Sequence, residues 1–200
     1  MAYVAWSVVF GEQPTAAKWN ILGTNDASFN DGTGFASGAI GSVHASLANG
    51  ITVQTVNTQT GTLATGTTLI PFDNTTPQNT EGTEFMTRSI TPKSATNILI
   101  IDVVAQLGLP GVVQNIGGAI FQDSTANALA TGNIGNVVTA SASGQMLIRH
   151  KMVAGTTSAT TFKFRAGPQV SGTLTFNGIS GGAFFNGTYA SSMTITEYKA

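Results

Sequence analysis

Cysteine is absent from this 200-residue chain, and charged residues are scarce. The absence of cysteine excludes disulfide bonds, thiolate catalysis and zinc sites built on cysteine. Lys, Arg, Asp and Glu together make up 8% of the residues, whereas they make up about 25% of an ordinary globular protein. The formal net charge is −1, so electrostatic repulsion does little to keep copies of the chain apart. Such a surface predicts contact with other subunits.

Two further classes of protein are not expected. The eight basic residues do not form a cluster that could follow a phosphate backbone, so we expect no binding of nucleic acid. The longest apolar stretch, residues 98–105, is interrupted by Asp102. It is far shorter than the roughly 20 residues that a membrane-spanning helix needs. We therefore expect no insertion into a membrane.

The N-terminal segment, residues 1–35, has a helical pattern. Residues 12–23 favour a short helix in which Trp19 and Leu22, three positions apart, share one face. Phe29 follows in a second helical turn. Two such short helices cannot bury these three side chains on their own. The pattern therefore predicts a helical anchor that docks through them onto another surface.

Residues 36–66 are rich in Gly, Ala, Ser, Thr and Asn, a composition typical of flexible linkers. An extended stalk is the alternative that we favour, because apolar residues recur at every second or third position. In a stalk, these side chains would be buried against copies of the same chain in a homotrimer. The residues concerned are Ile51, Val53, Val56 and Leu63.

Residues 67–200 have the pattern of an antiparallel β-sandwich. Phe162 and Phe164 alternate with Lys163 and Arg165, which is the period of a strand with one buried face. Similar segments recur along the chain, separated by Gly, Asn, Asp or Pro. They are residues 85–90, 97–107, 118–122, 145–153, 160–165, 172–176 and 192–198. We expect a mainly β protein whose jelly-roll-like sandwich folds without the residues before about 67.

Few residues are candidates for catalysis or metal binding. His44 and His150 have neither a carboxylate nor a second histidine beside them in sequence, so we expect neither to be a base or a metal ligand. Asp73, Glu81 and Glu84 could hold calcium or supply the carboxylate pair of a glycosidase. Their segment, however, has the composition of ordinary turns and lacks the calcium-loop spacing. We expect no enzymatic activity, no metal and no cofactor.

Aromatic residues near the C-terminus are the remaining candidates for recognition. Phe184, Phe185 and Tyr189 lie in a segment rich in Gly and Asn, where rings on a loop could stack on a sugar or anchor a protein partner. The alternative, which we favour, is that one or two of these rings close the end of the sandwich.

Segments from both parts of the chain resemble structural proteins of tailed bacteriophages. The run 11–34 is similar to the N-terminal segment of many phage fibre and virion-surface proteins. Other segments look like a C-terminal β-sandwich common among these proteins; they are residues 70–85, 91–94, 164–167, 175–178 and 194–197. The resemblance implies a homotrimer that attaches to the particle through Trp19, Asn20 and Phe29 and displays its sandwich outward; the helical face adds Leu22 to these attachment residues.

Together, the pattern and the resemblance predict a structural protein of the virion surface, made in the host cytoplasm. A long fibre shaft is absent, so we expect a short tail fibre, a head fibre or a capsid decoration protein. The expected partners are copies of the chain, other virion proteins (capsid, portal, collar or tail) and a host-surface glycan or protein. The alternative is a free-standing carbohydrate-binding β-sandwich module, for which the aromatic segment is the support.

Overall fold

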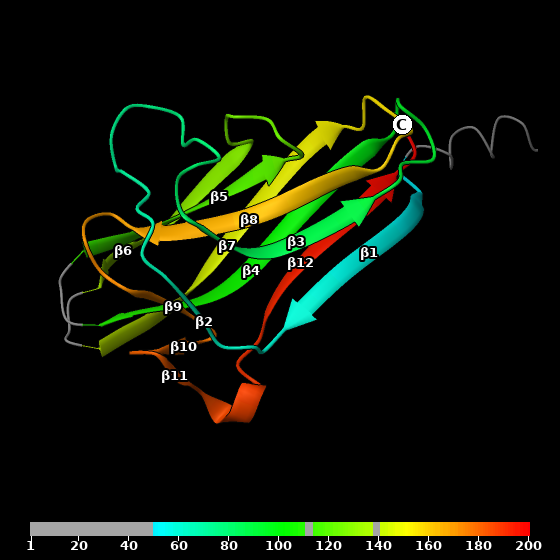
Figure 1. Cartoon of the computed structure of the whole chain (residues 1–200). Coiled ribbons are helices and arrows are strands. Elements are labelled where there is room, and N and C mark those ends of the chain that lie inside the picture. Colours follow the sequence, from blue (N-terminus) through cyan, green and yellow to red (C-terminus); the bar gives the residue numbers. More distant parts are fainter. Residues whose placement is uncertain (1–49, 111–113, 138–140) are drawn as a thin grey trace, which may run out of the picture. The chain divides into compact units, whose positions relative to one another are not determined.

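Two antiparallel β-sheets form the part of the chain that the computed structural model describes, namely residues 50–110, 114–137 and 141–200 (Figure 1). The first sheet contains β1 (Thr52–Thr60), β2 (Ala64–Gly66), β4 (Ile98–Pro110), β7 (Ser141–Val153), β9 (Leu174–Phe176) and β12 (Ser191–Tyr198). The second contains β3 (Thr83–Ile90), β5 (Gln114–Gln122), β6 (Ala130–Val137) and β8 (Thr160–Pro168). The hairpin β10 (Gly178–Ile179) and β11 (Gly182–Ala183) precedes a 3-10 turn, η1 (Phe185–Gly187).

The long strand β4 organises the first sheet. It pairs with β7 along one edge over its whole length. Its other edge pairs first with β12 and then with β9. β1 pairs with the far side of β12, and β2 pairs with the far side of β9. In the second sheet the order is β3-β8-β5-β6.

The hydrophobic core lies between the two sheets. Alternate residues of β4, such as Ile101 and Val103, are fully buried, as are Phe162 and Phe164 of β8. Burying each large apolar side chain contributes about 1.5–3 kcal/mol to stability. The mainly β fold and the antiparallel sandwich that the sequence predicts are therefore confirmed.

The strands of the sandwich begin earlier in the chain than predicted. β1 and β2 both lie within residues 36–66, which the sequence assigned to a stalk, and β1 pairs along its length with β12. Residues 51–200 form one compact unit. Val56, a predicted stalk residue, packs instead against the core of its own chain. The alternation of residues 51–57 is thus that of a sheet strand, and the sandwich starts at β1 rather than at residue 67.

Several predicted residues lie outside the described part of the chain. They are the attachment residues Trp19, Asn20, Leu22 and Phe29, the remainder of the predicted anchor, and His44.

A buried carboxylate connects β12 to two other segments. Glu197 is fully buried at an inward position of β12. Its Oε1 accepts hydrogen bonds from the Asn97 side chain (2.6 Å) and from the backbone N–H groups of Lys93 (2.8 Å) and Ser94 (3.3 Å). Its Oε2 accepts one from Gln54 Nε2 of β1 at 2.6 Å. Burial by itself raises the pKa of Glu197, but these hydrogen bonds outweigh burial and lower the pKa below its ordinary value.

Candidate functional site

The three predicted aromatic residues come together in the structure. The ring centroids of Phe184 and Phe185 are 6.0 Å apart, and Tyr189 lies 5.5 Å from the first and 6.2 Å from the second. These are the distances and tilts of interacting rings. Phe185 is 76% exposed, whereas the other two rings are half-buried. We call these three residues the aromatic cluster.

The backbone presents Phe185 in an unfavourable conformation. Its φ is +48°, and φ is also positive at the next two residues, Asn186 and Gly187. Asn and Gly tolerate this left-handed region, but a bulky residue rarely adopts it. Strain of this kind costs on the order of 1–3 kcal/mol and is concentrated at functional sites. Here it holds an apolar ring out in solvent, where the ring contributes little to packing.

The loop that carries the aromatic cluster is held at its base by close backbone contacts. A Cβ atom on Gly61 would lie 1.8 Å from the carbonyl oxygen of Gly187, so only glycine allows this approach. The Asn177 side chain, which is 1% exposed, donates hydrogen bonds to the carbonyl oxygens of Thr60 (2.8 Å) and Thr62 (3.0 Å). The loop (orange, at the bottom of Figure 1) therefore rests on a rigid connection between β1 and β2.

The predicted carboxylates do not converge. Asp73 accepts hydrogen bonds within its own turn, and Glu81 accepts one from the backbone of the same loop. Glu84 forms ion pairs with Lys163 (3.7 Å) and Arg165 (3.5 Å). Across the described ranges, no three His, Asp or Glu side chains are grouped as metal ligands.

His150 lies on β7 with its ring half-buried. Burial lowers its pKa below the ordinary value of 6.5, because a charged imidazole loses hydration there. The neutral form of the side chain is therefore favoured by burial. No helix in the described part of the chain is long and apolar enough to cross a membrane.

A second candidate surface is the outer edge of the first sheet, which we call the β1 edge (residues 51–60). Among the described strands, only β12 pairs with β1, so the other side of β1 is open. Its sequence carries no charge and no proline, two of the devices that usually prevent edge strands from pairing with other chains. A third device, a β-bulge, is confined to its start, where the register with β12 shifts between Thr52 and Gln54. Ile51 and Val53 are 46% and 38% exposed at the start of this edge, and Leu63, beyond its other end, is 36% exposed.

A third feature was not predicted from the sequence. The loop of residues 69–82 lies across the second sheet and encloses a hollow against β5 and β6. The available signal was the presence of Gly117 and Gly167 inside strand-like segments, because glycine within a strand often marks a close approach of another segment.

Comparison with known proteins gives remote likenesses. No family model and no curated protein sequence matches this chain. A structure of infectious bursal disease virus, Gx strain, is 11% identical with a TM-score of 0.31, and it covers 74% of this chain and 38% of that one. A crystal structure of the VP2 subviral particle of the same virus is 11% identical with a TM-score of 0.32, and the match covers 74% of this chain and 38% of that one. The enzymatically active domain of bacteriophage CBA120 tailspike protein 4 is 15% identical with a TM-score of 0.25, and the match covers 66% of this chain and 21% of that one. The chain thus spans well under half the length of each.

Proposed function

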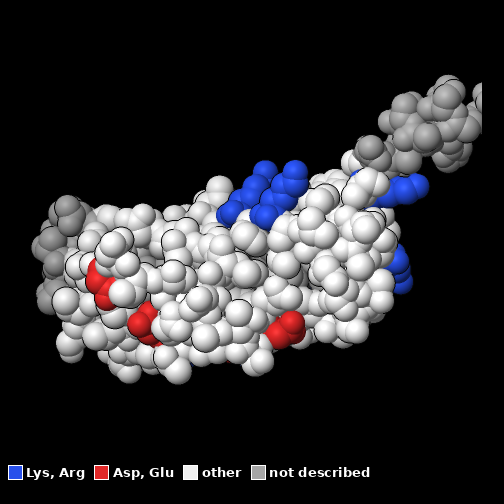
Figure 2. All heavy atoms as spheres, turned by 90° about the horizontal axis from the view of Figure 1, so that it is seen from above, with Lys and Arg blue, Asp and Glu red and all other residues white. Residues whose placement is uncertain are grey.

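We propose that this chain is a structural protein of a virus particle, a homotrimeric short fibre or decoration protein that displays its β-sandwich outward. The observation that carries the proposal is the β1 edge, an uncharged nine-residue strand whose outer side is open in the described part of the chain. The scarcity of charge adds support, since most of the face in Figure 2 is neither acidic nor basic. Weak repulsion and an open edge both favour assembly with further copies.

In this proposal the N-terminal segment attaches the protein to the particle. Trp19, Asn20, Leu22 and Phe29 are the proposed contacts with a capsid, portal, collar or tail protein, as the resemblance to phage fibre proteins and the predicted helical face imply. Antibodies against residues 51–200 should label the surface of intact particles from cells that make the protein, as seen by immunoelectron microscopy. Label that stays in the soluble fraction of the lysate would contradict a place on the virion.

The aromatic cluster is the proposed contact with the host surface. A ring that is 76% exposed and held by a strained backbone gives a rigid apolar anchor of the kind found at the centre of interfaces. The same cluster supports the second candidate function, a free-standing carbohydrate-binding module. The two candidates differ in oligomeric state, because such a module needs no second copy.

Self-association is expected to depend on the β1 edge. Light scattering of the purified protein should give about three times the chain mass at micromolar concentration. Val53→Lys places a charge on the open edge and should shift the protein to monomers that keep the circular-dichroism spectrum of the folded sandwich. The matched control is Val170→Lys, at a residue 53% exposed elsewhere on the sandwich; this variant should remain trimeric. A monomeric unaltered protein would contradict the homotrimer and favour the second candidate.

A further inference from the structure

The loop of residues 69–82 lies directly on the backbone of the second sheet because two neighbouring strand positions lack side chains. A Cβ atom on Gly167 of β8 would lie 2.1 Å from the carbonyl oxygen of Thr68. A Cβ atom on Gly117 of β5 would lie 2.9 Å from Cγ2 of Ile70. Ile70 itself is only 3% exposed. The loop is therefore seated on the sheet by packing.

Hydrogen bonds hold the far end of the same loop. The Arg165 guanidinium donates from Nε to the carbonyl oxygen of Glu81 (2.9 Å) and from Nη2 to that of Gly82 (2.7 Å). Asn79 Nδ2 donates to the carbonyl oxygen of Ser124 at 3.2 Å, which joins the loop to the turn after β5. A hollow beneath such a loop exists before any ligand arrives, and this reduces the entropy lost on binding.

The hollow between this loop and strands β5 and β6 has a volume of about 400 Å³, within the range of small-molecule sites. Backbone of Gly117, Gly118 and Gly132 forms part of its lining. A second hollow of about 290 Å³ adjoins it, because the two share Thr75, Pro77 and Thr131 as lining residues. We call the two adjoining hollows the trough.

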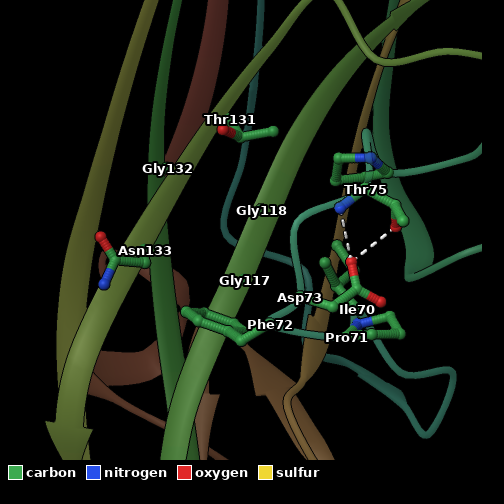
Figure 3. A pocket seen from close by; sticks show the side chains of 11 residues that line it. Ile70, Pro71, Phe72, Asp73, Thr75, Gly117, Gly118, Thr131, Gly132 and Asn133 are labelled. Atoms are coloured by element: carbon green, nitrogen blue, oxygen red, sulfur yellow. Dashed lines mark hydrogen bonds between the residues drawn. The ribbon is translucent and has the colours of Figure 1, made fainter.

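An aromatic ring and several polar groups surround the hollow (Figure 3). Phe72 is 40% exposed and lies beside Gly117, with Asn133 on one side and Asp73 on the other. Asp73 Oδ1 accepts hydrogen bonds from Thr75 N (2.8 Å) and Thr75 Oγ1 (2.5 Å), which lower the pKa of the carboxyl. Both bonds from Thr75 go to Oδ1, and neither goes to Oδ2. The amide of Asn133 is exposed.

We propose that this trough binds a neutral oligosaccharide. The C–H face of a sugar ring packs on the exposed face of Phe72, and the sugar hydroxyls bond to Asp73 Oδ2, the Asn133 amide and the Thr131 hydroxyl. None of the described residues that line the trough is Lys, Arg or His, and Asp73 repels an anion. Acidic sugars and phosphates are therefore poor ligands. This site comes from different elements than the aromatic cluster and does not depend on attachment to a virion.

The test uses the full chain and a glycan array of neutral and acidic oligosaccharides, followed by calorimetric titration of the hits. At least one neutral oligosaccharide should bind, and versions of it that carry sialic acid or glucuronic acid should bind at least tenfold more weakly. In ¹⁵N-labelled protein, its titration should shift the amide signals of residues 72–75 and 131–133. An array with no neutral hit, or with acidic hits only, would overturn the proposal.

Variants separate this trough from the aromatic cluster. Phe72→Ala should weaken binding by about tenfold, because it removes the stacking face. Phe72→Tyr, which keeps the ring, should bind as the unaltered chain does, and so should the control Val170→Ala, at an exposed residue that does not line the trough. Phe72→Tyr and the control should melt as the unaltered protein does. Phe72→Ala truncates a ring that is 40% exposed, and it should remain folded at the temperature of the titration, as checked by circular dichroism. Loss of binding in Phe185→Ala but not in Phe72→Ala would overturn the assignment to the trough, while leaving the virion proposal untouched.

Discussion

A fragment of residues 67–200 is expected not to fold into a cooperatively melting domain, whereas a fragment of residues 51–200 is expected to melt close to the temperature of the full chain. The shorter fragment lacks β1 and β2. Without β1, the whole length of β12 loses its hydrogen-bonding partner on one side. This change should exceed the effect of any single substitution, because a complete ladder of backbone bonds and the packing beneath it are lost together.

Specific contacts of the missing residues add to this loss. Removal of Gln54 takes one hydrogen-bond donor from the buried Glu197. Removal of Thr60 and Thr62 leaves the buried Asn177 side chain without two of its acceptors. Thermal denaturation followed by circular dichroism compares the two fragments directly. A sharp transition of the 67–200 fragment at the temperature of the 51–200 fragment would show that β1 is dispensable.

Among single substitutions of polar residues, replacement of Glu197 is expected to lower the free energy of unfolding the most. Glu197→Ala removes the acceptor of the buried Asn97 amide and of the backbone N–H groups of Lys93 and Ser94. It also removes one of the two acceptors of Gln54 Nε2, which keeps the carbonyl oxygen of Thr91. We expect the free energy of unfolding at pH 7 to fall by about 3 kcal/mol. The melting temperature of a domain of this size should then fall by roughly 10 °C. Glu84→Ala, at a partly exposed ion pair, is the matched control and should cost less than about 1 kcal/mol.

The lowered pKa of Glu197 also predicts acid sensitivity. Its folded-state pKa lies below the ordinary value of 4.5, so its stabilising contribution is complete above that pH. The contribution is lost as the pH falls through the folded-state pKa, because the carboxylate is then protonated. Urea denaturation at a series of pH values should show that Glu197→Gln reduces the loss of stability in acid. The same acid dependence in both proteins would contradict this role.

The alternation of apolar and polar residues with a period of two was sufficient to predict the β-sandwich, but not the residue at which the sandwich begins. Phe162 and Phe164 alternate with charged residues, so their buried face is evident from the sequence. In β1, by contrast, Thr, Gln and Asn occupy both faces, and its apolar residues fit a stalk between copies of the chain as well as they fit a strand paired with β12. The role of Glu197 could not be predicted either, because it too depends on contacts between distant segments. A carboxylate is normally read as solvent-exposed, and its donors come from segments about a hundred or more positions away in the chain.

Of the candidate sites, the aromatic cluster could be predicted from residues that are close together in the sequence, whereas the trough depends on residues that are far apart. The spacing of Phe184, Phe185 and Tyr189 in a Gly- and Asn-rich segment predicted a loop, because those residue types favour turns. The trough could not be predicted in this way. Gly117 and Gly167 are fifty positions apart, and only the pairing of β5 with β8 places them opposite each other beneath the loop.

The pairing of β1 with β12 also determines when the protein can finish folding during its synthesis. These are the first and last strands of the described chain, and Thr52 lies opposite Tyr198. At translation speeds of roughly 5–20 residues per second, β1 leaves the ribosome on the order of ten seconds before its partner does. Both sides of β1 are unpaired during that interval. Neighbouring nascent chains on one polysome would then present unpaired β1 strands to one another, so association between copies can begin before any single copy has completed its own sheet.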